Sequence, residues 1–339
     1  MSDTELLRTT DTAYDMVFKS AVDFSCIKAA FDLGLFQALA AGPRDLAGLA
    51  QKTESVPVRL ERFLLTLWQI GLVEKRDQQW ALTSLSNQFF TASLEHRNLT
   101  MVPFVDYLST MFEGYYLHLA DVVRGNRNFT SFVPHPPRTR EDSLYYETLH
   151  RSNLYFPIKL LVERAKLEEN EHLIDVGGGI GDIASAVCKQ FPNINITLIN
   201  LPNALGLVSE NVAANGLEGR ITPTAVDMYR EPYPTGDALL FSRILYPLGA
   251  QFCTMLCQKA FAALEPGGRI LILDMIISNP ERPNYDYLTH YLGGVGMDFS
   301  PFEFKNHNIY PDVLRSAGFV DVQFDEAYDH VLYQAIKPA

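Results

Sequence analysis

The sequence predicts two domains, an N-terminal all-α winged-helix domain and a C-terminal Rossmann-like α/β domain. With 339 residues, the chain is too long for one ordinary hydrophobic core. Its first part has a helical pattern, whereas after residue 171 short apolar runs alternate with helical stretches, as in a parallel sheet covered on both faces. We expect a winged helix over 1–95, a helical connecting region with a substrate pocket over 96–168, and the α/β domain over 169–339.

The winged helix is predicted from helix, turn, helix and a short two-stranded wing. Its expected elements are the helices 45–51 and 58–70 and the strands 72–74 and 80–82. The helix over 58–70 is rich in large apolar residues and carries only Arg59 and Arg62 as basic residues. A DNA recognition helix needs basic and amide side chains along an exposed face, so we expect this helix to pack against protein.

The N-terminal helices carry more apolar surface than a small domain hides, which predicts a homodimer formed mainly by this half. The residues concerned are Phe24, Phe31, Leu35, Phe36 and Trp68.

The net charge of −12 comes from 40 acidic and 28 basic residues. Such a surface disfavours nucleic acid as a partner.

The chain shows neither a signal-peptide pattern nor an apolar run near the roughly 20 residues that cross a membrane. Four scattered cysteines do not form a disulfide framework, and Cys253 and Cys257 are interpreted as buried thiols rather than a metal site. We expect a cytoplasmic protein with no membrane span and no bound metal.

The second half contains the runs expected to form the sheet. Parallel strands are expected over 173–177, 196–200, 238–242 and 269–274, and an antiparallel hairpin over 320–324 and 330–336 at one end of the sheet. A single helix over 142–167, beginning with an Asx cap at Asp142, is expected to connect the domains. Its polar segment His150-Arg-Ser-Asn153 is a candidate wall of the substrate site, with solvent exposure as the alternative.

A glycine loop is predicted between the first strand and the following helix, in Asp175-Val-Gly177-Gly-Gly179-Ile-Gly181-Asp182. Glycines at this point let the backbone turn sharply and approach a ligand. The dinucleotide pattern GxGxxG fails, because Asp182 stands where the last glycine is required. This glycine spacing suits a cofactor that has an amino-acid moiety and no pyrophosphate. The ammonium group of such a cofactor would lie in the electric field of the Asp175 carboxylate.

Two further positions are candidates for binding the rest of an adenosyl cofactor. Asn200 ends the second strand, where adenosine-binding folds usually place an acidic residue against the ribose hydroxyls. Asparagine lacks that charge and accepts less strongly. Asp227 and Met228 follow a third strand, which ends before the fourth one at 238–242, and are expected to flank the adenine, with a role of Asp227 in the turn itself as the alternative.

These motifs carry a resemblance. In order, IDVGGGIGD, INLP, VDMY, LEPGG and the winged helix resemble the class I S-adenosylmethionine-dependent methyltransferases, in the branch called O-methyltransferase family 2, over nearly the full chain. ETLHRSN, FSRILY and YDYLTHYLGGVGM are similar to the bacteriochlorophyllide C-20 methyltransferases of green sulfur bacteria. The resemblance implies a homodimer and S-adenosylmethionine as cofactor. The implied cofactor-binding residues are Asp175, Gly177, Gly179, Asn200, Asp227, Met228 and Arg243.

The chain departs from the family at the catalytic base. Phenol-methylating members have a histidine after the fourth strand, where this chain has Tyr246, and the acidic partner of that histidine has no counterpart near Phe304-Lys-Asn-His307. A tyrosine hydroxyl, with an ordinary pKa near 10, is a poor base. We expect Tyr246 to hydrogen-bond a ring carbonyl of a tetrapyrrole substrate. His290 is expected to accept a proton from that substrate or to bind the magnesium ion at its centre, with packing as the alternative.

The expected activity is C-methylation at the C-20 meso position of a bacteriochlorophyllide or related chlorin. Tyr246 and His290 are the predicted catalytic residues, and His150, Asn153 and Met297 are predicted to bind the tetrapyrrole substrate. The alternative is O-methylation of a phenolic or quinone-derived small molecule on the same scaffold. A third possibility, from another class, is a winged-helix regulator that binds a ligand without catalysis.

Overall fold

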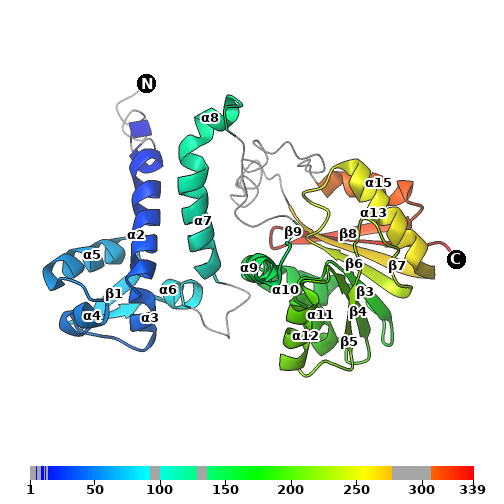
Figure 1. Ribbon diagram of the computed structural model, residues 1–339, viewed down its shortest axis with the longest axis horizontal. Helices are drawn as coiled ribbons and strands as arrows, with labels where there is room; N and C mark the ends of the chain where they lie inside the picture. The colour runs from blue at the N-terminus through cyan, green and yellow to red at the C-terminus, as the bar shows by residue number, and fades with distance from the viewer. Residues whose placement is uncertain are drawn as a thin grey trace. The chain divides into compact units, whose positions relative to one another are not determined.

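The computed structural model describes residues 14–91, 100–127, 136–276 and 307–339, together with Glu5, Thr9, Thr10 and Thr12. The chain divides into two compact units, Met1–Leu117 and His118–Ala339 (Figure 1). The division falls inside the predicted connecting region, and the boundaries between the three predicted regions stay a prediction.

The first unit is a small helical domain with a two-stranded wing. Its elements are η1 (Asp15–Lys19), α2 (Ser20–Asp32), α3 (Leu35–Ala40), α4 (Leu46–Lys52), α5 (Pro57–Gln69), β1 (Val73–Arg76), β2 (Gln79–Leu82), α6 (Ser84–Phe89) and α7 (Val102–Gly114). Asp45 caps α4 by accepting from the backbone N–H of Gly48, and Pro57 opens α5 at a position where its missing N–H costs nothing. The predicted winged helix is confirmed, because β1 and β2 pair antiparallel directly after α5.

The core of this unit forms where α5 packs against α3, α4 and the wing. Leu60, Leu64 and Leu67 are buried at helical spacing on one face of α5, and Trp80 of β2 is buried beside them. On the other side of the same helix, Leu65 and Trp68 are about half exposed. Part of the apolar surface of α5 is therefore left for contacts outside the unit.

The second unit is an α/β domain. Its elements are α8 (Leu119–Val123), α9 (Arg140–Arg151), α10 (Tyr155–Arg164), β3 (His172–Val176), α11 (Asp182–Gln190), β4 (Asn195–Asn200), α12 (Leu205–Ala214), β5 (Ile221–Ala225), β6 (Gly236–Ser242), α13 (Ala250–Ala263), β7 (Leu264–Met275), η4 (His307–Ile309), α15 (Tyr310–Ser316), β8 (Val320–Ala327) and β9 (His330–Ile336). The short helix η3 (Tyr116–His118) spans the division between the two units.

The seven-stranded sheet has the order β5-β4-β3-β6-β7-β9-β8. Strands β3 to β7 run parallel, whereas β9 pairs antiparallel with both β7 and β8. The predicted hairpin at one end of the sheet is therefore confirmed. Pro223 lies in β5, an edge strand, where a missing backbone donor is tolerated.

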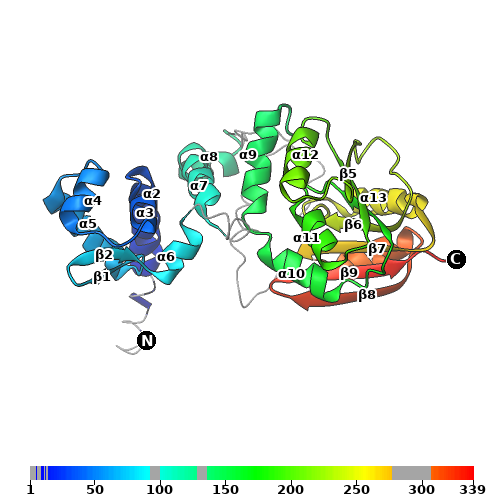
Figure 2. The ribbon, with the colours of Figure 1, turned by 90° about the horizontal axis from the view of Figure 1, so that it is seen from below.

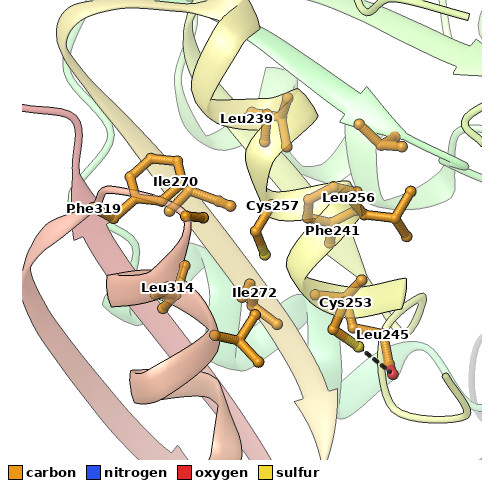
Figure 3. Packing of buried hydrophobic residues seen from close by; sticks show 14 of the residues in the cluster. Leu239, Phe241, Leu245, Cys253, Leu256, Cys257, Ile270, Ile272, Leu314 and Phe319 are labelled. Carbon is orange, nitrogen blue, oxygen red and sulfur yellow. Dashed lines mark hydrogen bonds between the residues drawn. The ribbon is translucent and has the colours of Figure 1, made fainter. Parts of the chain in front are cut away.

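The sheet is covered on both faces by helices, as the apolar strands predicted (Figure 2). Alternate residues of one strand face opposite layers: Leu239 and Phe241 pack with α13 and α15, whereas Ala238 and Leu240 pack with α10, α11 and α12. Figure 3 shows the first layer, in which Cys253 and Cys257 are fully buried and the Cys253 thiol lies 3.5 Å from the Leu245 carbonyl oxygen. The interpretation of these two residues as buried thiols is confirmed.

The predicted single helix over 142–167 is wrong, because the chain forms two helices, α9 and α10, with a break after Arg151. Pro157 explains the break: inside a continuous helix its ring clashes with the carbonyl four residues earlier, but it fits the first turn of α10. The cap also differs from the expectation. Thr139 is the N-cap, and Asp142 completes a capping box by accepting from the Thr139 backbone.

Within the described residues, no helix is long and apolar enough to cross a membrane.

Candidate cofactor and substrate site

The glycine loop lies at the carboxyl end of β3 and leads into α11. Gly177, Gly179 and Gly181 have φ values of +65°, +57° and +87°, a region that other residues enter only at a cost. The Gly177 N–H donates to the carbonyl of Ile199 on β4 at 2.9 Å, which fixes the start of the loop to the neighbouring strand. The loop therefore lies at the edge where parallel sheets bind cofactors.

Side chains from two other segments pack against the loop where a side chain on glycine would stand. A Cβ on Gly177 would lie 2.8 Å from Cδ1 of Ile244, which follows β6. A Cβ on Gly179 would lie 2.7 Å from Oε2 of Glu147 on α9. Both positions also have a positive φ, so a side chain there would be strained even after these neighbouring side chains moved away.

Asp175, at the end of β3, is a fully buried carboxylate beneath the loop. Among the described residues, neither of its carboxylate oxygens has a hydrogen-bond partner. Burial raises its pKa to about 7. An uncompensated acid of this kind gains from a nearby cation, so its placement fits a ligand that carries an ammonium or sulfonium charge.

Asn200 and Asp227, both predicted to bind the cofactor, have local partners in the structure. Asn200 donates from Nδ2 to the carbonyl of Gly179 at 3.0 Å and accepts at Oδ1 from the N–H of Leu201 at 2.8 Å. Asp227 accepts at Oδ1 from the N–H of Tyr229 at 2.9 Å, while the carbonyl of Met228 accepts from Tyr233. The turn role of Asp227 is thus present, and contact with adenine stays a proposal.

Arg243, His150 and Asn153 form one cluster. Arg243 follows β6 with a φ of +55°, which is strained for a residue with a side chain. Its Nη2 lies 3.0 Å from Nδ1 of His150 and donates to the His150 carbonyl at 3.1 Å, and Nη1 donates to Oδ1 of Asn153. The structure therefore brings together two predicted substrate residues and one predicted cofactor residue.

A second cluster joins α9 to the loop and was not predicted. Arg151 donates to both carboxylate oxygens of Asp182, with Nη2 to Oδ1 at 2.9 Å, and to Oδ1 of Asn211 at 3.0 Å. Asn211 donates in turn to the carbonyl of Ile180 at 2.9 Å. This network connects α9, α11 and α12 around the loop and sets the position of α9.

Glu147 is the acidic residue that the sequence reasoning missed. It lies one helical turn before Arg151, only partly exposed, and its pKa is raised to about 7. Burial is the largest cause; the charges of Arg243 and Arg151 and a hydrogen bond with Asn200 oppose it, and Asp182 reinforces it. No spacing in the sequence indicates this contact, although Glu147 opens the segment ETLHRSN that contributed to the resemblance.

Tyr246, the predicted catalytic residue, lies in the turn between β6 and α13 and is almost fully buried against Met275, the last residue of β7. It is therefore at the same edge of the sheet as the glycine loop. His290 and Met297, also predicted site residues, lie outside the described residues.

The residues present fit S-adenosylmethionine. The glycines give the loop the tight backbone turn that such a ligand needs, and two carboxyl groups of raised pKa, Asp175 and Glu147, lie against the loop. A cationic ligand would compensate the buried Asp175 carboxylate, which has no other charge against it. Neither feature favours a pyrophosphate, whose negative charges these carboxylates would repel.

Known protein families match both halves of the chain. Residues 116–319 match the O-methyltransferase domain, and residues 16–92 match the O-methyltransferase dimerisation domain. The second match supports the predicted homodimer.

Individual relatives agree with the family models. The chain is 48% identical over 338 residues to bacteriochlorophyllide d C-20 methyltransferase of Chlorobaculum tepidum, covering 100% of both chains. It is 28% identical to 3-hydroxy-5-methyl-1-naphthoate 3-O-methyltransferase of Streptomyces sahachiroi, covering 88% of this chain and 86% of the relative. Its fold matches human N-acetylserotonin methyltransferase in complex with S-adenosylmethionine with a TM-score of 0.80, at 22% identity and 100% and 99% coverage. The chain therefore belongs to the O-methyltransferase family of S-adenosylmethionine-dependent methyltransferases.

Proposed function

We propose that this methyltransferase methylates carbon C-20 of a bacteriochlorophyllide. The observation that carries the proposal is the 48% identity, over the full length of both chains, to bacteriochlorophyllide d C-20 methyltransferase. Tyr246 supports it, because a buried tyrosine stands where phenol-methylating members of the family have their histidine base. Membership of a methyltransferase family argues against the regulator without catalysis.

The proposed reaction is a displacement. S-adenosylmethionine supplies a methyl group activated by a sulfonium. The methine carbon of the chlorin attacks through its π-system, so that a carbon–carbon bond forms, the sulfur–carbon bond breaks, and the C-20 proton leaves afterwards. The protein must align the reacting atoms and exclude water. No phenol has to be deprotonated, so a hydrogen-bond donor suffices at position 246.

Individual roles follow from placement. We propose that Tyr246 donates to a ring carbonyl of the macrocycle, at the sheet edge where Met275 packs against it. Arg243 is held in place by hydrogen-bond contacts with His150 and Asn153, where α9 ends and α10 begins. We propose that Arg243 binds the carboxylate of the cofactor's methionine moiety and that His150 and Asn153 contact the substrate. His290 and Met297 keep their predicted roles as proton acceptor or magnesium ligand and as substrate contact.

The second candidate is O-methylation of a phenolic or quinone-derived small molecule. It is favoured by the O-methyltransferase family model and by the 28% identity to a naphthoate 3-O-methyltransferase.

The four free cysteines fit a reducing compartment, and we propose a cytoplasmic location.

A substrate screen tests the proposal. The protein is incubated with S-adenosylmethionine labelled in the methyl group and either bacteriochlorophyllide d or a set of catechols and hydroxynaphthoates. Label transfer to the chlorin, at carbon C-20 by nuclear magnetic resonance, is expected. Transfer only to a phenol oxygen would make the second candidate the function.

A further inference from the structure

The ribose position of the cofactor site lacks its usual acidic residue. Asn200 stands at the end of β4, and its side chain is already engaged at both ends, with the Gly179 carbonyl and the Leu201 N–H. Its remaining capacity is that of a neutral carbonyl acceptor. A ribose presents two hydroxyl donors, and Asn200 alone is a weak partner for them.

A carboxylate from a different element lies close to Asn200. Glu147 hydrogen-bonds the Asn200 side chain, and its Oε2 stands 2.7 Å from where a Cβ of Gly179 would be. Glu147 therefore lies over the loop at the end of β4, although it is more than fifty positions earlier in the chain.

The position of Glu147 is fixed by the helix that carries it. Arg151, one turn further along α9, pairs with the buried Asp182 at the start of α11. At the other end of the helix, Asn203 donates to Oγ of Ser143 at 3.0 Å and to the carbonyl of Pro137 at 2.7 Å. Contacts at both ends of α9 thus hold Glu147 against the loop.

We propose that Glu147 accepts the ribose hydroxyls of S-adenosylmethionine, replacing the acidic residue that β4 lacks. This inference rests on the cofactor, not on the tetrapyrrole substrate. A carboxylate has about four lone-pair sites, so accepting from Asn200 leaves room for two hydroxyls. Such charge-assisted hydrogen bonds are short and strong.

The raised pKa of Glu147 is consistent with this role. Without a ligand the carboxyl is poorly solvated, and the groups facing it are Arg243 and Arg151, which favour its charge, and Asp182, which opposes it. Two hydroxyl donors would stabilise the ionised form. Ribose binding should therefore be tighter at pH 8 than at pH 6.

The test compares two ligands by calorimetry. S-adenosylhomocysteine has the adenosine and the amino-acid moiety, whereas 5′-methylthioadenosine has the adenosine, with its ribose, and no amino-acid moiety. Glu147→Gln should weaken both by a similar factor of about tenfold or more, the size expected for lost charge-assisted hydrogen bonds. Glu141→Gln, an exposed position on the same helix, is the matched control and should leave both affinities unchanged.

Other outcomes overturn the proposal. If Glu147→Gln weakened the binding of S-adenosylhomocysteine but not that of 5′-methylthioadenosine, Glu147 would contact the ammonium group instead. If neither affinity changed, Glu147 would not contact the cofactor. Failure of the wild-type protein to bind either ligand would instead reject the cofactor assignment, and with it the methyltransferase function.

A measurement on the wild-type protein covers the case in which Glu147→Gln does not fold, as judged by thermal unfolding. The affinities of 5′-methylthioadenosine and its 2′-deoxy and 3′-deoxy analogues are compared at pH 6 and pH 8. A contribution of the hydroxyls that grows with pH supports the proposal, and one that is the same at both pH values contradicts it.

Discussion

Arg151 and Asp182 form an ion pair that ties α9 to the first turn of α11. Nη2 of Arg151 donates to Oδ1 of Asp182 at 2.9 Å, and Nε donates to Oδ2. The Asp182 side chain is 1% exposed, so the pair is shielded from solvent on its carboxylate side. Because Glu147 lies one turn earlier on α9, the same pair also sets the geometry over the glycine loop.

Replacing Arg151 by methionine should lower the free energy of unfolding by about 3 kcal/mol, since it leaves a buried carboxylate without its cation. Urea unfolding measures this. Arg140→Met is the matched control: Arg140 pairs with Glu210 on the surface, with both side chains more than half exposed, and should cost less than about 1 kcal/mol. Equal losses in the two variants would contradict the structural role of Arg151.

Asp175 should make the protein without cofactor less stable as the pH rises. Its pKa is raised from 3.8 to about 7 in the folded state, so between these values the folded state holds a proton that the unfolded state has released. Stability contributed by the protonated acid is therefore lost as pH rises through this window, and the loss is complete above pH 7.

Asp175→Asn removes this effect. Relative to the wild type, the variant should gain about 3 kcal/mol of unfolding free energy between pH 5 and pH 8, at 1.36 kcal/mol per pH unit within the window. Denaturant titrations at both pH values measure it. Asp312→Asn, at an exposed position, should show no such gain. A gain that does not depend on pH would show that Asp175 is already ionised in the folded state.

Gly179→Ala should abolish measurable binding of S-adenosylhomocysteine. The new Cβ would lie 2.7 Å from Oε2 of Glu147, so the Glu147 carboxylate must swing away from the loop and leave its place beside the cofactor site. Gly216→Ala is the control: it has a similar φ of +66° but nothing within 4 Å of the new Cβ. Both variants should lose about 1–2 kcal/mol of stability from backbone strain, and only Gly179→Ala should lose binding by calorimetry.

The N-terminal half should form a stable two-fold dimer. Of the residues on which the prediction rested, Leu35 and Phe36 are in the core of the first unit, whereas Trp68 is 53% exposed. Leu65 and Val58, also on α5, are exposed with it. Light scattering at micromolar concentration should give the mass of two chains, and a monomer would contradict the prediction.

The sequence predicted the fold well because the sheet has a local signal. Each parallel strand is a short apolar run, and the glycine loop follows the first of them. The wing after α5 was equally visible. The break between α9 and α10 was not predicted, although Pro157 marks it. The sequence alone does not show whether a proline stands in the first turn of a new helix, where it is tolerated, or inside a longer one.

The sequence indicates where candidate site residues lie only when those residues follow a strand of the sheet. Asp175, Gly177 and Gly179 follow from their order along the chain, as does Tyr246 after β6. Glu147 does not, because its contact with Gly179 depends on how α9 packs over the loop, which the Arg151–Asp182 pair decides. The absence of an acid at Asn200 was visible in the sequence, but its replacement from another element was not.

Tyr246→Phe should slow methyl transfer without changing cofactor affinity. Tyr246 is 7% exposed and packs against Met275, so losing one hydroxyl leaves the packing intact and removes only a hydrogen-bond donor. If that donor holds a carbonyl of the chlorin with its methine edge in line, kcat should fall about tenfold, corresponding to one hydrogen bond lost in the transition state. The Kd of S-adenosylhomocysteine should stay the same.

Steady-state kinetics with bacteriochlorophyllide d and calorimetry make this measurement, with Tyr328→Phe as the control at an exposed position. The position of the methyl group in the residual product is the second readout. A positioning donor predicts the same carbon-methylated product, formed more slowly, because the phenylalanine variant still excludes water. If Tyr246 instead acted as the base for a phenol, activity would disappear in the variant, and the wild-type product would carry the methyl group on oxygen.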